Sequence, residues 1–149
     1  MWRSMGVLLC LGMGCGDKEA VDTAIGDSAQ PDSTPEPTIC EVVLPANTWV
    51  ITDAQVGGAA GAVAWVCKGG SLDINGPGGV FVVEGGGSIA INASDGRYYA
   101  RNYSAVALNV SGTEIFHEQM AAITVNAIGT LNLCDEIVVD ASAVPQGCE

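Results

Sequence analysis

The chain has 149 residues, a length that fits one domain, and its 20 glycines with only 5% aromatic residues are typical of a β-rich protein of small side chains. Its formal net charge is −12, and the few basic residues form no cluster. This balance argues against nucleic acid as a partner and against electrostatic attachment to anionic lipid.

Residues 1–14 have the features of an export signal. One basic residue, Arg3, precedes a short apolar run at residues 7–11. The run is too short to span a bilayer as a helix, so we expect the segment to direct export and to be absent from the mature protein.

Cys15 follows Gly14, as in the bacterial lipobox, where a small residue precedes a cysteine that is lipidated and becomes the new N-terminus. We therefore predict lipidation of Cys15 and attachment to a membrane through its acyl chains. Plain secretion is the alternative, in which Cys15 is an unmodified thiol within the discarded signal.

Residues 15–39 are predicted to form a disordered tether that begins at the lipidated cysteine. The segment is acidic and rich in Asp, Ser, Thr and Pro, and its prolines at positions 31, 35 and 37 prevent both a helix and a strand ladder. Such a tether would hold a folded domain away from the lipid surface.

A repeat of 17 residues occupies residues 62–140. The segments 71–75, 88–92, 105–109 and 122–126 align without an insertion, and each ends in asparagine. A fixed short period of this kind predicts a solenoid.

Alternating apolar pairs within each repeat predict two short strands per rung, and stacked rungs pair each strand with its copy in a parallel sheet. The fold class is therefore all-β: a small two-sheet parallel β-solenoid, or β-helix-like fold, of about five rungs. The inward positions expected on one sheet are Ala64, Val66, Phe81, Val83, Tyr98, Ala100, Ile115 and His117. Those expected on the other sheet are Leu72, Ile74, Ile89, Ile91, Val106, Leu108, Ile123 and Val125.

The last rung departs from the period. A shift by one residue makes Leu131 and Leu133 the inward pair of its first strand and brings Cys134 to the corner position of Cys67. Ile137 and Val139 are then expected to supply the apolar pair of its second strand.

Disulfides are expected to fasten the two ends of the stack. Four rungs at about 4.8 Å separate Cys67 from Cys134 by roughly 19 Å, too far for a bond between them. Of the three connectivities open to four cysteines, we expect the economical one, Cys40–Cys67 with Cys134–Cys148. Residues 40–61 would then form an N-terminal cap and residues 141–149 a C-terminal cap. Disulfides also agree with export.

Two columns of polar side chains are expected to have structural roles. Amides at the repeated asparagines can hydrogen-bond from rung to rung; the column is Asn75, Asn92, Asn109 and Asn126. At the corner, Arg101 falls between Glu84 and Glu118, which predicts an ion ladder. An acid/base role for the two glutamates is the less favoured alternative, because no cleft-forming loop accompanies them.

An outward stripe of large side chains is the candidate binding surface. It consists of Trp65, Val82, Tyr99 and Phe116. Exposed aromatic rings at rung spacing are suited to stacking on sugars or docking a protein. The alternative is that they only cover the sheet and fix its register.

No catalytic, metal or cofactor site is predicted. His117 is the only histidine, no serine has a plausible base, and no CxxC spacing occurs. These absences argue against a catalytic triad or a zinc site, and the glycine-rich turns lack the aspartate that calcium-binding repeats require.

Four features occur together in this chain: Gly14-Cys15, the acidic tether, Trp65-Val66-Cys67 and the ending Val144-Pro145-Gln146-Gly147-Cys148. By these features the chain resembles uncharacterised bacterial lipoproteins that carry a small repetitive β-solenoid. The resemblance implies no activity, and at Tyr103 and Met120 the chain departs from the small turn residue that is usual there.

The leading hypothesis is a non-enzymatic, surface-displayed lipoprotein whose solenoid is a structural or interaction module of the cell envelope. The alternative is a carbohydrate-binding or adhesion module that uses the aromatic stripe. A polysaccharide-degrading enzyme is a third reading, based on fold analogy alone. Expected partners are the membrane, through Cys15, and a polysaccharide or an envelope protein. We expect an outer-membrane or cell-surface location, with a periplasmic or secreted protein as the alternative.

Overall fold

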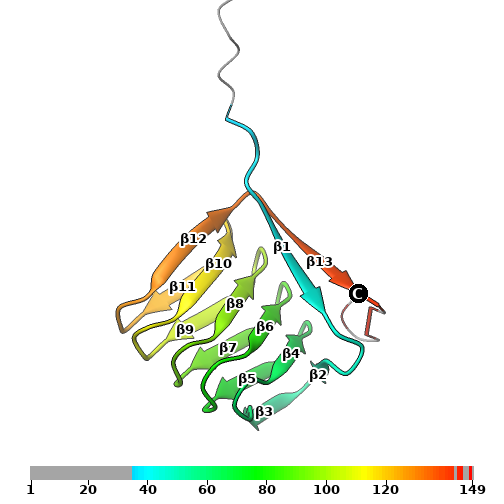
Figure 1. The fold of residues 1–149 in the computed structure, drawn as a ribbon, viewed down its shortest axis with the longest axis vertical. Coiled ribbons are helices and arrows are strands. Elements are labelled where there is room, and N and C mark those ends of the chain that lie inside the picture. Colours follow the sequence, from blue (N-terminus) through cyan, green and yellow to red (C-terminus); the bar gives the residue numbers. More distant parts are fainter. Residues whose placement is uncertain (1–34, 143, 146–147, 149) are drawn as a thin grey trace, which may run out of the picture. The chain divides into compact units, whose positions relative to one another are not determined.

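The computed structural model describes residues 35–142, 144–145 and 148. The domain is an all-β parallel solenoid of about five turns, as predicted (Figure 1). The predicted export signal, Cys15 and residues 16–34 of the predicted tether lie outside the described residues. Within the described part of the chain, no helix has the length and apolarity needed to cross a membrane.

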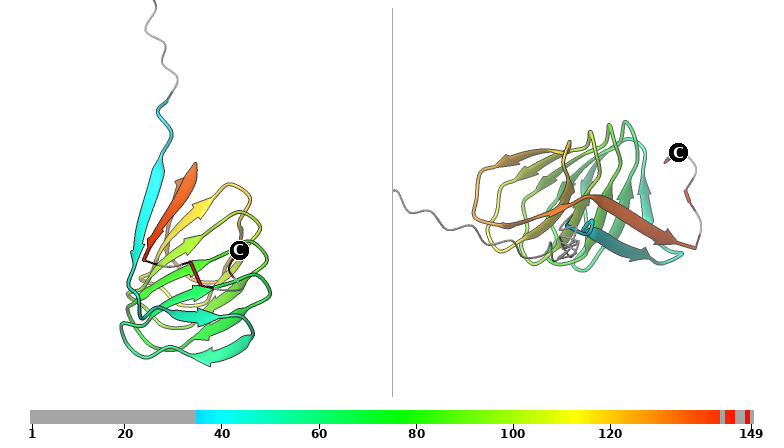
Figure 2. Two further views of the ribbon diagram at one scale, coloured as in Figure 1. Left: turned by 90° about the vertical axis from the view of Figure 1, so that its right-hand side faces the viewer. Right: turned by 90° about the horizontal axis from the view of Figure 1, so that it is seen from above.

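Two parallel sheets form the stack, and each rung except the last, which contributes β12 alone, adds one strand to each sheet (Figure 2). The six-stranded sheet contains β2 (Trp49–Ile51), β4 (Val63–Val66), β6 (Val80–Val83), β8 (Arg97–Ala100), β10 (Glu114–Glu118) and β12 (Thr130–Cys134). The five-stranded sheet contains β3 (Ala54–Gly57), β5 (Ser71–Ile74), β7 (Ser88–Ile91), β9 (Ala105–Leu108) and β11 (Ala122–Val125). Strand partners in the central rungs are 17 residues apart, as with Phe81 and Tyr98.

The solenoid begins earlier than the repeat indicated. β2 and β3 form a first rung inside the segment 40–61 that was expected to be a cap. Trp49 pairs with Ala64, an offset of 15 rather than 17 residues, because the turn between β2 and β3 is two residues shorter than the next one. β3 keeps the offset of 17, but Gln55 and Gly57 stand where later rungs have an apolar pair, which hides this rung in the sequence.

The core lies between the two sheets, and most of the predicted inward side chains are buried in it. Phe81 and Tyr98, one rung apart, stack with their ring centroids 5.2 Å apart. The exceptions come from the last rungs: His117 and Ile123 are partly buried, and Val125 is exposed. These positions have no complete rung beyond them to cover them.

The first strand of the last rung has the predicted shift in register. β12 pairs with β10 so that Ile115 faces Leu131 and Glu118 faces Cys134. The prediction for the second strand is wrong, because Ile137 and Val139 do not continue the five-stranded sheet. They belong to β13 (Glu136–Ala141), which pairs in parallel with β1 (Ile39–Leu44).

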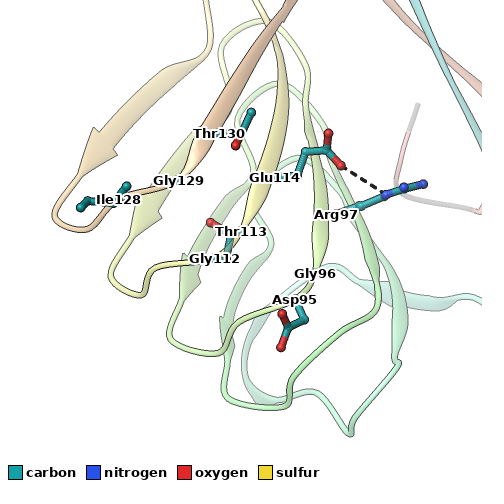
Figure 3. A pocket seen from close by; sticks show the side chains of 9 residues that line it. All are labelled: Asp95, Gly96, Arg97, Gly112, Thr113, Glu114, Ile128, Gly129 and Thr130. Atoms are coloured by element: carbon teal, nitrogen blue, oxygen red, sulfur yellow. Dashed lines mark ion pairs between the residues drawn. The ribbon is translucent and has the colours of Figure 1, made fainter.

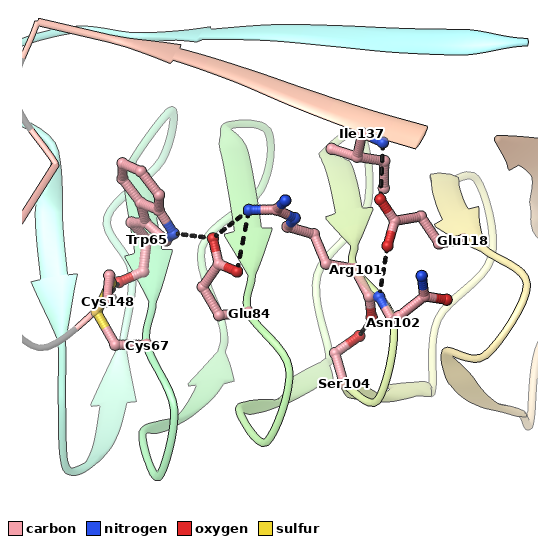
Figure 4. A network of polar contacts seen from close by, with 9 residues as sticks. All are labelled: Trp65, Cys67, Glu84, Arg101, Asn102, Ser104, Glu118, Ile137 and Cys148. Atoms are coloured by element: carbon pink, nitrogen blue, oxygen red, sulfur yellow. Dashed lines mark hydrogen bonds and ion pairs between the residues drawn. A yellow bond between two sulfur atoms is a disulfide. The ribbon is translucent and has the colours of Figure 1, made fainter. Parts of the chain in front are cut away.

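The pair β1 and β13, which we call the ribbon, lies across the outer face of the six-stranded sheet (Figures 1 and 4). Apolar side chains of both ribbon strands, among them Val42 and Ile137, pack in one cluster with Trp65, Val82 and Tyr99. The ribbon therefore forms a third layer over one sheet. It enters beside the last rung, where the backbone amide of Asp135 donates to the carbonyl oxygen of Thr38 at 2.9 Å.

The disulfide connectivity differs from the prediction. The bonds are Cys40–Cys134 and Cys67–Cys148, with Cα–Cα distances of 5.8 and 4.5 Å. The prediction placed Cys40 over the first rung, whereas β1 starts at the last rung and runs back along the stack. Disulfides of this number in a small domain indicate an oxidising, extracytoplasmic environment.

Candidate functional site

The predicted binding stripe is not exposed. The ribbon covers it, so that Trp65 retains only 4% of its surface, while Val82 and Tyr99 are also buried and Phe116 is partly buried. Tyr99 and Phe116 stack at 4.9 Å between centroids. Burial raises the pKa of Tyr99 above its ordinary value, with a further upward contribution from Glu114 and an opposing one from Arg97. The stripe is packing between two layers and does not present rings to a sugar.

The corner column forms an ion pair and not a full ladder (Figure 4). Arg101 Nη1 lies 3.2 Å from Glu84 Oε1, and the same carboxylate oxygen accepts a hydrogen bond from the indole nitrogen of Trp65 at 2.8 Å. Glu84 thereby joins its own rung to the rung before it, through Trp65, and to the rung after it, through Arg101.

Glu118, the third residue of the predicted ion ladder, accepts hydrogen bonds from backbone amides instead. It is 5% exposed, and its two carboxylate oxygens accept hydrogen bonds from the backbone amides of Asn102 at 2.7 Å and Ile137 at 2.8 Å. One carboxylate therefore joins a turn of the stack to the start of β13 (Figure 4). In this structure both glutamates are occupied by contacts that hold the fold.

The asparagine column is a continuous amide ladder, as predicted. Side-chain amides donate to the side-chain oxygen one rung back: Asn92 to Asn75 at 3.4 Å, Asn109 to Asn92 at 2.9 Å and Asn126 to Asn109 at 2.8 Å. His117 is half-buried, with Nδ1 3.2 Å from the carbonyl oxygen of Glu118. Among the described residues, no group of three or more metal-ligating side chains occurs.

A polar groove of about 520 Å³ lies along the turns of three successive rungs (Figure 3). Arg97 and Glu114 form an ion pair across it at 3.3 Å, and both are substantially exposed. Asp95 has a left-handed backbone, and its carboxylate accepts a hydrogen bond from Ser94 at 2.8 Å. The hydroxyl of Thr113, at the groove wall, is buried without a partner. Sequence reasoning missed the groove because its walls come from turns in separate repeats.

The last rung presents an apolar surface, which we call the open end. Ile128 is 84% exposed and Leu133 is 58% exposed, although Leu133 occupies an inward column. The exposed large hydrophobic residues of this region are Met120, Val125, Ile128, Leu131 and Leu133, and the exposed Tyr103 lies in the turn one rung before Met120. No described strand pairs with the outer edge of β11 or β12.

The opposite end of the stack, which we call the closed end, is better covered, although β2 and β3 are also edge strands and Trp49 keeps 38% of its exposure. Trp49 lies over Gly57, where a β-carbon would come within 3.8 Å of the indole ring. Ile51, in an inward column of the same rung, is 1% exposed. The two ends of the solenoid thus differ, and the open end is the candidate functional surface of the domain.

Comparisons of the chain with protein-family models, with curated proteins and with solved structures found no match.

Proposed function

We propose that this protein is an exported, lipid-anchored and non-catalytic module of the cell envelope that acts through protein interaction at the open end of its solenoid. The observation that carries the proposal is the open end itself. Uncovered apolar columns and unpaired strand edges are features that a soluble β protein usually covers or blocks with charge. A stack closed at one end and open at the other is suited to present one surface to a partner.

The two disulfides support the exported part of the proposal, because such bonds persist outside the reducing cytoplasm. The lipobox-like pair Gly14-Cys15 supports the anchor. With Trp65 and Tyr99 buried and Phe116 partly buried, the stripe has little ring surface to offer a sugar, so we do not retain the carbohydrate-binding alternative.

Replacing Cys15 tests the anchor. In cells fed an alkyne-labelled fatty acid, the wild-type protein should carry the label and fractionate with membranes. Cys15→Ala should lose the label and leave the membrane fraction. Cys10→Ala, a change at the other cysteine near the N-terminus, is the matched control and should keep both properties. Full labelling of Cys15→Ala would contradict the anchor.

A further inference from the structure

The inward columns of the solenoid continue to the last rung without a cap. Leu131 and Leu133 of β12 stand in register with Ile115 and His117 of β10, and Val125 of β11 with Leu108 of β9. Ile115 and Leu108 are fully buried, whereas their counterparts in the last strands are exposed. Their burial therefore needs material from outside the described domain.

The column of turns that leads to the open end gives a second, independent indication of a binding surface. Gly69, Gly86 and Tyr103 occupy one left-handed turn position in successive rungs, with φ of 82°, 84° and 65°. A non-glycine residue with this backbone is disfavoured, by about 1 kcal/mol or more. Tyr103 nevertheless has this backbone and is 68% exposed, and the next rung has the exposed Met120 in the corresponding place. The backbone is thus strained at a position where the exposed tyrosine adds to the apolar surface.

The strand edges at the open end favour a β-type contact. β11 and β12 contain no charged residue and no proline, the usual means of blocking an edge. The edge strands at the closed end also lack charge, but the inward columns of β3 there hold the polar Gln55 and Gly57, so that end offers less apolar surface. The apolar complement of the open end is therefore another open end, not the closed one.

We propose that a second copy of this chain covers the open end, forming a symmetric dimer. A two-fold axis normal to the sheets would place β12 beside β12 of the partner, antiparallel, so that the six-stranded sheet continues into the other copy, while the five-stranded sheet ends one strand earlier and its edge strands β11 would not pair. The inward leucines would then meet across the axis. Closed two-fold contacts of this kind are the commonest form of self-association. The inference deepens the proposed function, since it names the partner of the same open end.

Size and charge set the strength of this contact. Strands of four or five residues span about 15 Å, and sheets lie about 10 Å apart, so each end buries less than the roughly 800 Å² per partner of a stable complex. The domain also has eleven acidic and three basic residues in 40–149, a net of −8, which repels a second copy at long range. We therefore expect a weak dimer that forms where anchoring concentrates the protein. The described part of the chain enters each domain beside Asp135, at the last rung.

Photo-crosslinking of the full-length protein in its own membrane tests the contact at low affinity. A benzophenone side chain replaces Leu133 at the open end, or Val43 on the exposed side of the ribbon as a control. Two differently tagged copies are expressed together. Position 133 should give an adduct of twice the chain mass that carries both tags, and position 43 should not.

Charge substitutions then locate the surface. Leu131→Asp should lower the adduct at position 133 at least about tenfold, because a carboxylate would be buried without a partner. Val56→Asp adds the same charge at the closed end and should leave the adduct unchanged. Retention of both disulfides on non-reducing gels shows that each variant is folded.

Three results would overturn the dimer. These are the absence of an adduct with both tags, an adduct formed only with a different protein, or loss of the adduct in Val56→Asp, which would indicate head-to-tail stacking. An adduct with a different protein would still agree with an interaction module, so failure of the dimer is distinguishable from failure of the proposed function.

Discussion

Glu118 is the only acidic or basic side chain that is buried among the described residues, and it holds two layers together. Its carboxylate accepts backbone hydrogen bonds from Asn102 and from Ile137 at the start of the ribbon. A carboxylate that receives two amide hydrogen bonds is better placed there than any apolar side chain, because both amides would otherwise be buried without an acceptor.

Glu118→Ala should therefore lower the free energy of unfolding by about 2 to 4 kcal/mol, measured by urea denaturation. Glu118→Gln keeps one oxygen acceptor and should lose less. Glu114→Ala removes a half-exposed partner of Arg97 and should change stability by about 1 kcal/mol or less. Equal losses of stability in Glu118→Ala and Glu114→Ala would show that the buried hydrogen bonds of Glu118 contribute no more than an exposed ion pair.

Tyr98 predicts how stability depends on alkaline pH. Burial, with a smaller contribution from Asp95, raises the pKa of Tyr98 from 10.0 to about 12. Because the unfolded chain loses this proton first, the contribution of Tyr98 is complete below pH 10 and disappears as the pH rises toward about 12. The melting temperature should fall across this interval. Tyr98→Phe keeps the ring stack on Phe81 and should make the fall shallower; an unchanged slope would contradict the assignment.

Tyr103 predicts a conflict between stability and interaction. Asparagine tolerates a left-handed backbone better than tyrosine, so Tyr103→Asn should raise the free energy of unfolding by about 1 kcal/mol, or a few degrees in melting temperature. Tyr103→Ala should not gain as much, because alanine keeps the strain. If the open end binds a second copy, the stabilised Tyr103→Asn variant should crosslink less. A less stable Tyr103→Asn would mean that the tyrosine ring itself holds the turn.

At the scale of the elements, the strands that repeat could be predicted from the sequence, and the strands that do not repeat could not. The strands from β4 to β12 follow from apolar pairs at a fixed spacing, and the amide ladder follows from asparagine at the same spacing. The segment 39–44 has no copy elsewhere in the chain. Its position depends on a long-range pairing with residues 136–141 that no local pattern specifies.

The errors about the site share this cause. Trp65 and Tyr99 were correctly assigned to the outer face of the sheet, but a period cannot show that the ribbon lies over that face. The disulfide prediction is wrong for the same reason, because the path of β1, which the repeat does not specify, decides which cysteine bonds to Cys40. The exposure of Leu133, in contrast, follows from the absence of a further rung, which only the structure shows.

The ribbon should depend on its covalent links. Replacing both Cys40 and Cys134 by alanine removes the bond that holds the ribbon to the last rung, a loss of about 2 to 5 kcal/mol for a native disulfide. The stripe beneath the ribbon should then become accessible at lower denaturant. Acrylamide quenching of Trp65, measured with Trp2 and Trp49 replaced by phenylalanine, reports this opening. Wild-type quenching throughout the denaturant series would show that packing alone retains the ribbon.

At the scale of the whole molecule, the ribbon and the stack have matching lengths. Four rung steps of about 4.8 Å separate the rung of Cys134 from that of Cys67, about 19 Å in all, and six ribbon residues at about 3.3 Å span about 20 Å. The ribbon is bonded near the last rung by one disulfide, and the chain that follows it is bonded to the rung of Cys67 by the other. The number of rungs is therefore tied to the length of the ribbon, although a solenoid by itself has no preferred length.

Deleting residues 76–92 removes one full period and joins Asn75 to Ala93 with every column still aligned. The shortened stack should fold, but the ribbon would extend about 5 Å beyond its proper place, so Cys40–Cys134 should form normally while the yield of Cys67–Cys148 falls. Peptide mapping without reduction measures both bonds. Deleting residues 76–91 is the matched control: it removes the same rung but leaves one more residue in the turn after Asn75, and because the stack elsewhere accommodates offsets of 15 and 16 residues, the yield of Cys67–Cys148 should fall in the same way. Wild-type yields of both bonds after the 17-residue deletion would show that the ribbon does not set the length of the stack.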